Sequence, residues 1–189
     1  MPVTIGAKQE SDFTDPIGLL GDCHRRIERF LGAFVKVAEQ AQGGELSEIQ
    51  RSALQAAIAY FRNAGPRHTA DEEQDLFPKL RGIDRATVKE LLSRVDRLET
   101  DHRIADTLHG EANEIGERWL NEGALSPDAA ARLSEVLAAL SAMYRTHIAL
   151  EDDEIFPVAA AELSAADKEE IGRDMAARRG VPFRSPKFS

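Results

Sequence analysis

The sequence has a single cysteine, few aromatic residues and no excess of positive charge. One cysteine, Cys23, excludes an internal disulfide and a cysteine-based zinc or iron–sulfur site, and it fits a reducing compartment. A formal net charge of −9 argues against non-specific nucleic-acid binding, which needs a concentrated basic face. Any chemistry in this protein must therefore rest on other side chains.

Long apolar runs are also missing. No stretch approaches the ~18 apolar residues of a membrane span. The first residues lack the basic head and apolar segment of a secretory signal. We therefore expect a cytoplasmic protein with no membrane partner. A chain of 189 residues is long enough to bury one core without disulfides.

Apolar residues at helical spacing predict four long amphipathic helices joined by short connections. Asp15, Ser47 and Ser126 each stand where a helix N-cap is expected, and Pro follows directly after the first and third of them. Ser164 starts a fifth helix, which Gly180 ends. The pattern predicts an all-α, up-down-up-down four-helix bundle with an extra C-terminal helix and tail.

We divide the chain into an irregular N-terminal arm, the bundle, and a C-terminal helix with a tail, at residues 1–14, 15–161 and 162–189. Within the bundle, Gly65-Pro66 should interrupt the second helix just before His68, because proline removes a helical hydrogen bond. A short separate helix is expected at about residues 85–92. Ser93 and Asp96 should then cap the third long helix.

One sequence pattern occurs twice, at residues 68–78 and 147–157. It reads His-x-Ala-x-Glu, an acid, any residue, an acid, Leu or Ile, and Phe-Pro. The His and Glu of each copy are four residues apart, so both lie on one helix face. A further histidine precedes each copy, His24 by 44 positions and His102 by 45. A nearly constant offset of 78 to 79 positions therefore relates the two halves of the chain.

If the four helices meet, six side chains converge: His24, His68, Glu72, His102, His147 and Glu151. Four imidazoles and two carboxylates are too many for one tetrahedral zinc ion and suit two ions that share both carboxylates. This mixed ligation favours iron or manganese over calcium or magnesium. About one position on each ion stays open, where oxygen, peroxide or nitric oxide could bind. Buried carboxylates also need a cation nearby, because an uncompensated buried charge is costly.

An alternative interpretation is a structural or interaction bundle that binds no metal, since one inward histidine is more often a hydrogen-bonded core residue than a ligand. The duplicated spacing favours the metal site. Further candidates to join it are Tyr60, Asp106, His109 and Tyr144. Packing is the simpler explanation for the tyrosines, and a structural or surface role for the histidine. Acidic residues such as Glu73 and Asp152 are interpreted as solvated. We assign no catalytic residue.

These residues resemble the hemerythrin-like (HHE cation-binding) family over about residues 15–161. The resemblance implies a non-haem di-iron centre in a four-helix bundle, with two irons joined by an oxo or hydroxo group. It implies that the four histidines are terminal ligands and that Glu72 and Glu151 are bridges.

The sequence departs from the oxygen-carrying hemerythrins at two points. Those proteins have a second histidine four residues after the one matching His102, where this chain has Asp106. Their last carboxylate is an aspartate five residues after the final histidine, whereas Glu151 lies at four and Asp152 at five. The pattern is more similar to bacterial hemerythrin-like proteins and to the di-iron domain of iron–sulfur-cluster repair proteins.

We therefore expect a di-iron protein that binds, senses or handles iron, oxygen, peroxide or nitric oxide. Its partners would be metal ions and small diatomic or peroxide ligands. One alternative is an enzyme for peroxide disproportionation or nitric oxide reduction, and another is an iron donor in cluster repair. The repair proteins carry a cysteine-bearing segment ahead of this domain, which the printed sequence does not contain, so repair is not carried over directly.

Overall fold

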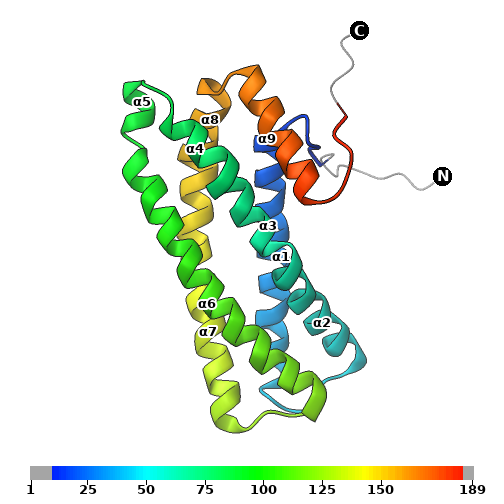
Figure 1. Cartoon of the computed structure of the whole chain (residues 1–189). Helices are drawn as coiled ribbons and strands as arrows, with labels where there is room; N and C mark the ends of the chain where they lie inside the picture. Colours follow the sequence, from blue (N-terminus) through cyan, green and yellow to red (C-terminus); the bar gives the residue numbers. More distant parts are fainter. Residues whose placement is uncertain (1–9, 185–189) are drawn as a thin grey trace, which may run out of the picture.

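Four helical rods run side by side along the molecule in the computed structural model, which describes residues 10–184 (Figure 1). The first rod is α1 (Pro16–Ala41). The second consists of α2 (Glu48–Asn63), α3 (Gly65–Ala70), the π-helical segment η1 (Asp71–Leu76) and α4 (Phe77–Arg81). The third is α6 (Leu92–Glu122), preceded by α5 (Ala86–Lys89). The fourth consists of α7 (Pro127–Leu150), the π-helical segment η2 (Glu151–Ile155) and α8 (Phe156–Glu162), and a further helix, α9 (Ala165–Arg178), follows.

The arrangement confirms the predicted fold class. Helix α1 packs against α2 and α7, and α6 packs against the same two helices, which closes a four-rod bundle. Residues 10–184 contain only helices and irregular connections. Residues 1–9 of the predicted arm and 185–189 of the predicted tail lie outside the described part of the chain.

Most helix starts lie where the sequence predicts them. The Asp15 side chain accepts from the Gly18 amide at 3.1 Å, and Ser47 forms a reciprocal capping box with Gln50. The start of α6 was predicted incorrectly. This helix begins at Leu92, ahead of Ser93, and no side chain caps it. A separate short helix does precede it, as expected.

A polar layer divides the apolar interior into two cores. One core contains Ile27, Phe34, Leu54, Trp119 and Leu137. The other contains Leu20, Phe77, Leu98, Ile155 and Met175. Between them lie histidine and glutamate side chains that are almost fully buried, and these are the predicted site residues. No helix in the described part of the chain is both long and apolar enough to cross a membrane.

Helix α9 packs across α1 and η1 at the end of the bundle that holds the second core (Figure 1). Ile171 and Met175 are fully buried there. Gly172 approaches the arm so closely that a Cβ atom would lie 1.9 Å from the Phe13 carbonyl oxygen. Arg178 and Arg179, at the end of the helix, both pair with Asp71 of η1. The extra helix is therefore tied directly to the segment that carries Glu72.

Candidate metal centre

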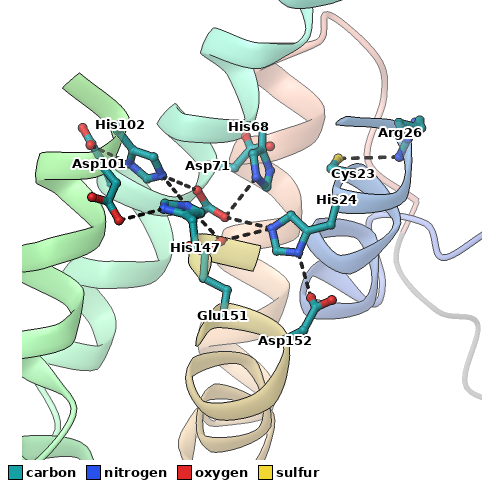
Figure 2. Close-up of polar contacts among 12 residues, drawn as sticks. Cys23, His24, Arg26, His68, Asp71, Asp101, His102, His147, Glu151 and Asp152 are labelled. Carbon is teal, nitrogen blue, oxygen red and sulfur yellow. Dashed lines mark hydrogen bonds and ion pairs between the residues drawn. The ribbon is translucent and has the colours of Figure 1, made fainter. Parts of the chain in front are cut away.

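The six predicted site residues meet in the polar layer, from four different rods (Figure 2). They form two overlapping groups, and the potential ligand atoms of each group lie within 4.8 Å of one another. One group is His24, His68, Glu72 and Glu151, and the other is Glu72, His102, His147 and Glu151. Both glutamates belong to both groups.

The imidazole Nε2 atoms all point toward the carboxylates. Glu72 lies between His68 and His102, each with an Nε2–Oε distance of 3.3 Å. Glu151 lies between His24 and His147, each with an Nε2–Oε distance of 3.1 Å. Each carboxylate therefore faces one histidine from its own half of the chain and one from the other half.

The donor atoms are arranged to coordinate a cation rather than to form hydrogen bonds with one another. Both carboxylate oxygens of Glu72 and of Glu151, and Nε2 of His24, are buried without a hydrogen-bond partner among residues 10–184. Buried polar atoms are normally paired, and a buried charge is paired or coordinates a metal. This arrangement is that of a site for a metal ion or ions.

The electrostatics lead to the same conclusion. Burial and the neighbouring Glu151 raise the pKa of Glu72 well above its ordinary value. Burial also opposes charge on Glu151, but close contacts with His147 and His24 outweigh it and lower that pKa. Burial works against charge on His24, yet Asp152 and Glu151 raise its pKa to about 9. Ionising both of these neighbouring buried carboxylates is unfavourable unless additional positive charge lies nearby.

Three further carboxylates face the outer nitrogens of these histidines. Asp152 accepts from Nδ1 of His24 at 2.7 Å, and Glu73 accepts from Nδ1 of His102 at 2.9 Å. The interpretation of Glu73 and Asp152 as solvated was wrong, because each immediately follows a site glutamate and reaches across to a histidine of the other half. The acid after each Glu in the repeated pattern was the signal for this role. Such partners fix the ring orientation and tautomer of a ligating histidine.

The third outer carboxylate was missed in the sequence. Asp101 Oδ2 lies 3.5 Å from Nδ1 of His147, which is longer than a hydrogen bond but places a negative charge opposite this nitrogen (Figure 2). No pattern predicted this contact, because Asp101 and His147 lie on different helices and Asp101 has no acidic counterpart in the first half.

The phenylalanine of each repeated pattern also reaches the other half. Phe156 stacks on His24 with a centroid distance of 5.1 Å and an interplanar angle of 14°. Phe77 lies nearly parallel to His102, with a centroid distance of 6.3 Å and an angle of 5°. Both phenylalanines are buried. The apolar rings shield the donor cluster on the side of the second core.

The proline after each phenylalanine explains the local helix geometry. Proline has no amide hydrogen, and its ring clashes with the carbonyl four residues earlier. In both halves the preceding turn widens into a π-helical segment, in which the phenylalanine amide bonds to the carbonyl of the site glutamate. Wide turns of this kind occur frequently at functional sites. Here they coincide with Glu72 and Glu151.

Gly65-Pro66 interrupts the second rod as predicted, since α2 ends at Asn63 and α3 begins at Gly65. The break does not remove His68 from the cluster. His68 is 5 % exposed and remains beside Glu72.

A cavity of about 350 Å³ adjoins the cluster, and all four site histidines line it. Phe61 and Ile148 form apolar parts of its wall, while Tyr144 and His109 add a polar pair with an Oη–Nε2 distance of 2.9 Å. Asp106 lines the cavity but belongs to neither ligand group. Tyr60 instead donates to the Cys23 carbonyl at 3.4 Å. The cavity gives a small molecule access to the donor atoms.

His109 should make the protein's stability depend on pH. Burial lowers the pKa of His109 from 6.5 to about 4. The folded state therefore binds a proton on His109 less readily than the unfolded state does. The stability that neutral His109 contributes is fully present above pH 6.5 and is lost as the pH falls toward 4. We expect the stability difference between wild type and His109→Gln to shrink by up to about 3 kcal/mol between pH 7 and pH 4. Urea unfolding of both proteins across this range measures it, and a constant difference would contradict the assignment.

Comparison with protein families matches residues 15–159 to the Hemerythrin HHE cation binding domain. A search of curated proteins finds no match to the chain.

Proposed function

The chain belongs to the hemerythrin HHE cation-binding domain family, and on that basis we propose that it binds two iron ions in its His/Glu cluster and handles iron or a small ligand of iron. The ligands in this proposal are His24, His68, His102 and His147, with Glu72 and Glu151 shared between the ions. The small ligand would be oxygen, peroxide or nitric oxide.

One observation carries the proposal. The two overlapping donor groups share both glutamates, and the oxygens of these glutamates are buried with no hydrogen-bond partner in the described part of the chain. A single ion would engage one group and leave two imidazoles without a role. Two ions use every donor.

The choice of iron rests on donor chemistry and on the family pattern. Imidazole suits zinc, copper, iron and nickel, whereas carboxylate suits harder ions, so the mixed set favours an ion such as iron or manganese that accepts both. The third long helix carries only one matching histidine, His102, and a glutamate follows four residues after His68 and after His147. This pattern supports the bacterial hemerythrin-like type rather than the oxygen carriers. Reversible oxygen transport is therefore not our proposal.

The chain's own residues define how a small ligand would be held. Two irons would supply redox chemistry and open positions for an oxygen or nitrogen donor. Phe61 and Ile148 exclude bulk water from part of the cavity, and Tyr144 offers a hydroxyl that can donate to a bound ligand or to His109. Glu73 and Asp152 hold the rings of two of the histidines in position.

Metal analysis and an absorption spectrum of freshly purified protein test the proposal. We expect about two irons per chain, with near-ultraviolet bands of oxygen-to-iron charge transfer. As a second readout, stripping the metal should lower the melting temperature, because an ion that binds only the folded state stabilises it. One zinc per chain, or no metal and no effect of chelation, would contradict the function and leave the bundle intact.

A second candidate is an enzyme that disproportionates peroxide or reduces nitric oxide, and the cavity beside the cluster favours it. Iron-loaded protein should then turn over one of these substrates faster than free iron. Turnover should disappear in His102→Ala and in Glu151→Ala. Turnover no faster than that of free iron would dismiss the enzyme and leave the binding function.

A further inference from the structure

The two halves of the site differ at one position that precedes the first histidine of each half. Asp101 precedes His102 and faces Nδ1 of His147. The equivalent residue in the first half, 78 positions earlier, is Cys23, which precedes His24. By the symmetry of the repeat, a carboxylate at position 23 would face His68.

His68 accordingly has no partner for its outer nitrogen. The Nδ1 atoms of His68 and His147 are both buried without a hydrogen bond among residues 10–184, but only His147 has a carboxylate opposite this atom, with Asp101 at 3.5 Å. The other three site histidines each have a carboxylate opposite Nδ1, at distances of 2.7, 2.9 and 3.5 Å. Figure 2 shows the Cys23 side chain linked to Arg26 rather than to His68.

We infer that the two metal positions are unequal, and that the ion held by His24 and His68 exchanges readily while the ion held by His102 and His147 is retained. This inference rests on the proposed two-ion function. The chain would then load and release one iron per cycle, with the retained ion keeping the cluster assembled.

The physical reason lies in where the imidazole proton must go. A metal bound at Nε2 forces the remaining proton onto Nδ1. In His102 this proton is donated to Glu73, so ligation also forms a charge-assisted hydrogen bond. In His147 the proton faces Asp101 Oδ2 at 3.5 Å, where a small movement of the carboxylate would form the hydrogen bond, whereas in His68 it is buried with no carboxylate opposite it, which opposes ligation. Without metal, His68 can carry its proton on Nε2, on the side that faces Glu72, and the buried Nδ1 is then left without a proton.

The second histidine of this position, His24, does have an outer partner. Asp152 orients His24, but it pairs with Arg25 as well, so its charge is shared between two partners. All four site histidines line the same cavity, so the difference between the two positions lies in the outer partners and not in access.

The structure has room for a carboxylate at position 23. Cys23, Arg26, Arg67 and Arg179 line a separate cavity of about 350 Å³. The Arg26 guanidinium already lies 3.5 Å from the Cys23 sulfur. These positive charges offset the cost of a buried aspartate, so Cys23→Asp is a practical way to copy the second half into the first.

Release of Fe²⁺ from the fully loaded protein to an excess of a colour-forming chelator, without oxygen, tests the inference. We expect two phases of similar amplitude whose rates differ by about 10-fold or more, the scale on which such histidine partners act. Cys23→Asp should slow the fast phase by about 10-fold and leave the slow phase unchanged. Asp101→Ala should accelerate the slow phase by a similar factor.

Cys23→Ala is the matched control, since it removes the sulfur without adding an acceptor, and both phases should match those of the wild type. A single phase from a wild-type chain that holds two ions overturns the inference. So does a fast phase that is unchanged in folded Cys23→Asp. If Cys23→Asp does not fold, Asp101→Ala provides the test. Release from Asp101→Ala in which the slow phase is as slow as in the wild type also overturns the inference. A wild-type chain that cannot load two ions contradicts the proposed function instead.

Discussion

Replacing Glu72 by Gln is expected to weaken metal binding at both positions by more than about 100-fold, beyond the ~10–100-fold cost of removing a ligand's hydrogen-bond partner. Glu72 belongs to both donor groups, so neither ion keeps its full ligand set. The metal-free variant should melt no lower than metal-free wild type. In the absence of metal, Glu72 is a buried carboxylate with no hydrogen bond from the described residues, and burial raises its pKa.

Asp106→Asn provides the matched control for Glu72→Gln, because it makes the same chemical change in a carboxylate that lines the cavity beside the cluster and belongs to neither donor group. Metal analysis after dialysis against a chelator and calorimetry with and without iron give the two readouts. The wild type and Asp106→Asn should lose stability when stripped, by about 2.7 kcal/mol at a metal concentration 100 times Kd. Equal metal retention in Glu72→Gln and Asp106→Asn would show that the wrong carboxylate has been chosen.

Replacing both Arg178 and Arg179 by Met is expected to lower the free energy of unfolding by about 3–5 kcal/mol, the usual cost of leaving one member of a buried ion pair alone. Asp71 is fully buried, and Arg179 Nη1 donates to it at 3.0 Å. Arg178 also donates to Asp75 at 2.8 Å. Burial already raises the pKa of Asp71 despite both arginines, so little else supports its charge.

The repeat itself supplies the rescue for this loss. Leu150 occupies the position in the second half that matches Asp71, so Asp71→Leu should fit its helix. Added to the double arginine variant, it should recover part of the lost stability, because Asp71 no longer needs a partner while the buried Asp75 still lacks Arg178. Arg173→Met is the surface control, since Arg173 is exposed and its only ion pair within the described residues is with Glu169 on its own helix. Urea unfolding compares the set, and no loss in the double variant would contradict the role of the pair.

The bundle and the clustering of the six candidate ligands were accessible from sequence because helical periodicity and the repeated pattern are local signals. His68 and Glu72 had to share a face whatever the rest of the chain did. Ser47 and Ser164 begin helices through interactions that lie within four residues. The start of α6 was predicted incorrectly because Leu92 begins the helix without a side-chain cap.

Spacing along the sequence could not predict the contacts between different helices. The partners of the histidine rings lie far along the chain, as with Asp152 and His24, which are 128 positions apart. An acidic residue in an acidic run looks the same whether it meets solvent or an imidazole. The attachment of α9 to Asp71 was hidden for the same reason, since a buried aspartate has no periodic signature.

The π-helical segments set the angle about the helix axis between each site glutamate and the phenylalanine that follows it, and amino-acid composition does not reveal this angle. Each wide turn adds a residue between the site glutamate and the buried phenylalanine that follows. If the same residues formed a regular α-helix instead, everything beyond the segment would turn by roughly 100° about the axis. Phe77 or Phe156 would then leave the histidine of the opposite half, although every ligand would still be present. The cluster therefore depends on the width of these two turns as well as on residue types, since the same residues on regular helices would not bring the phenylalanines to the histidines.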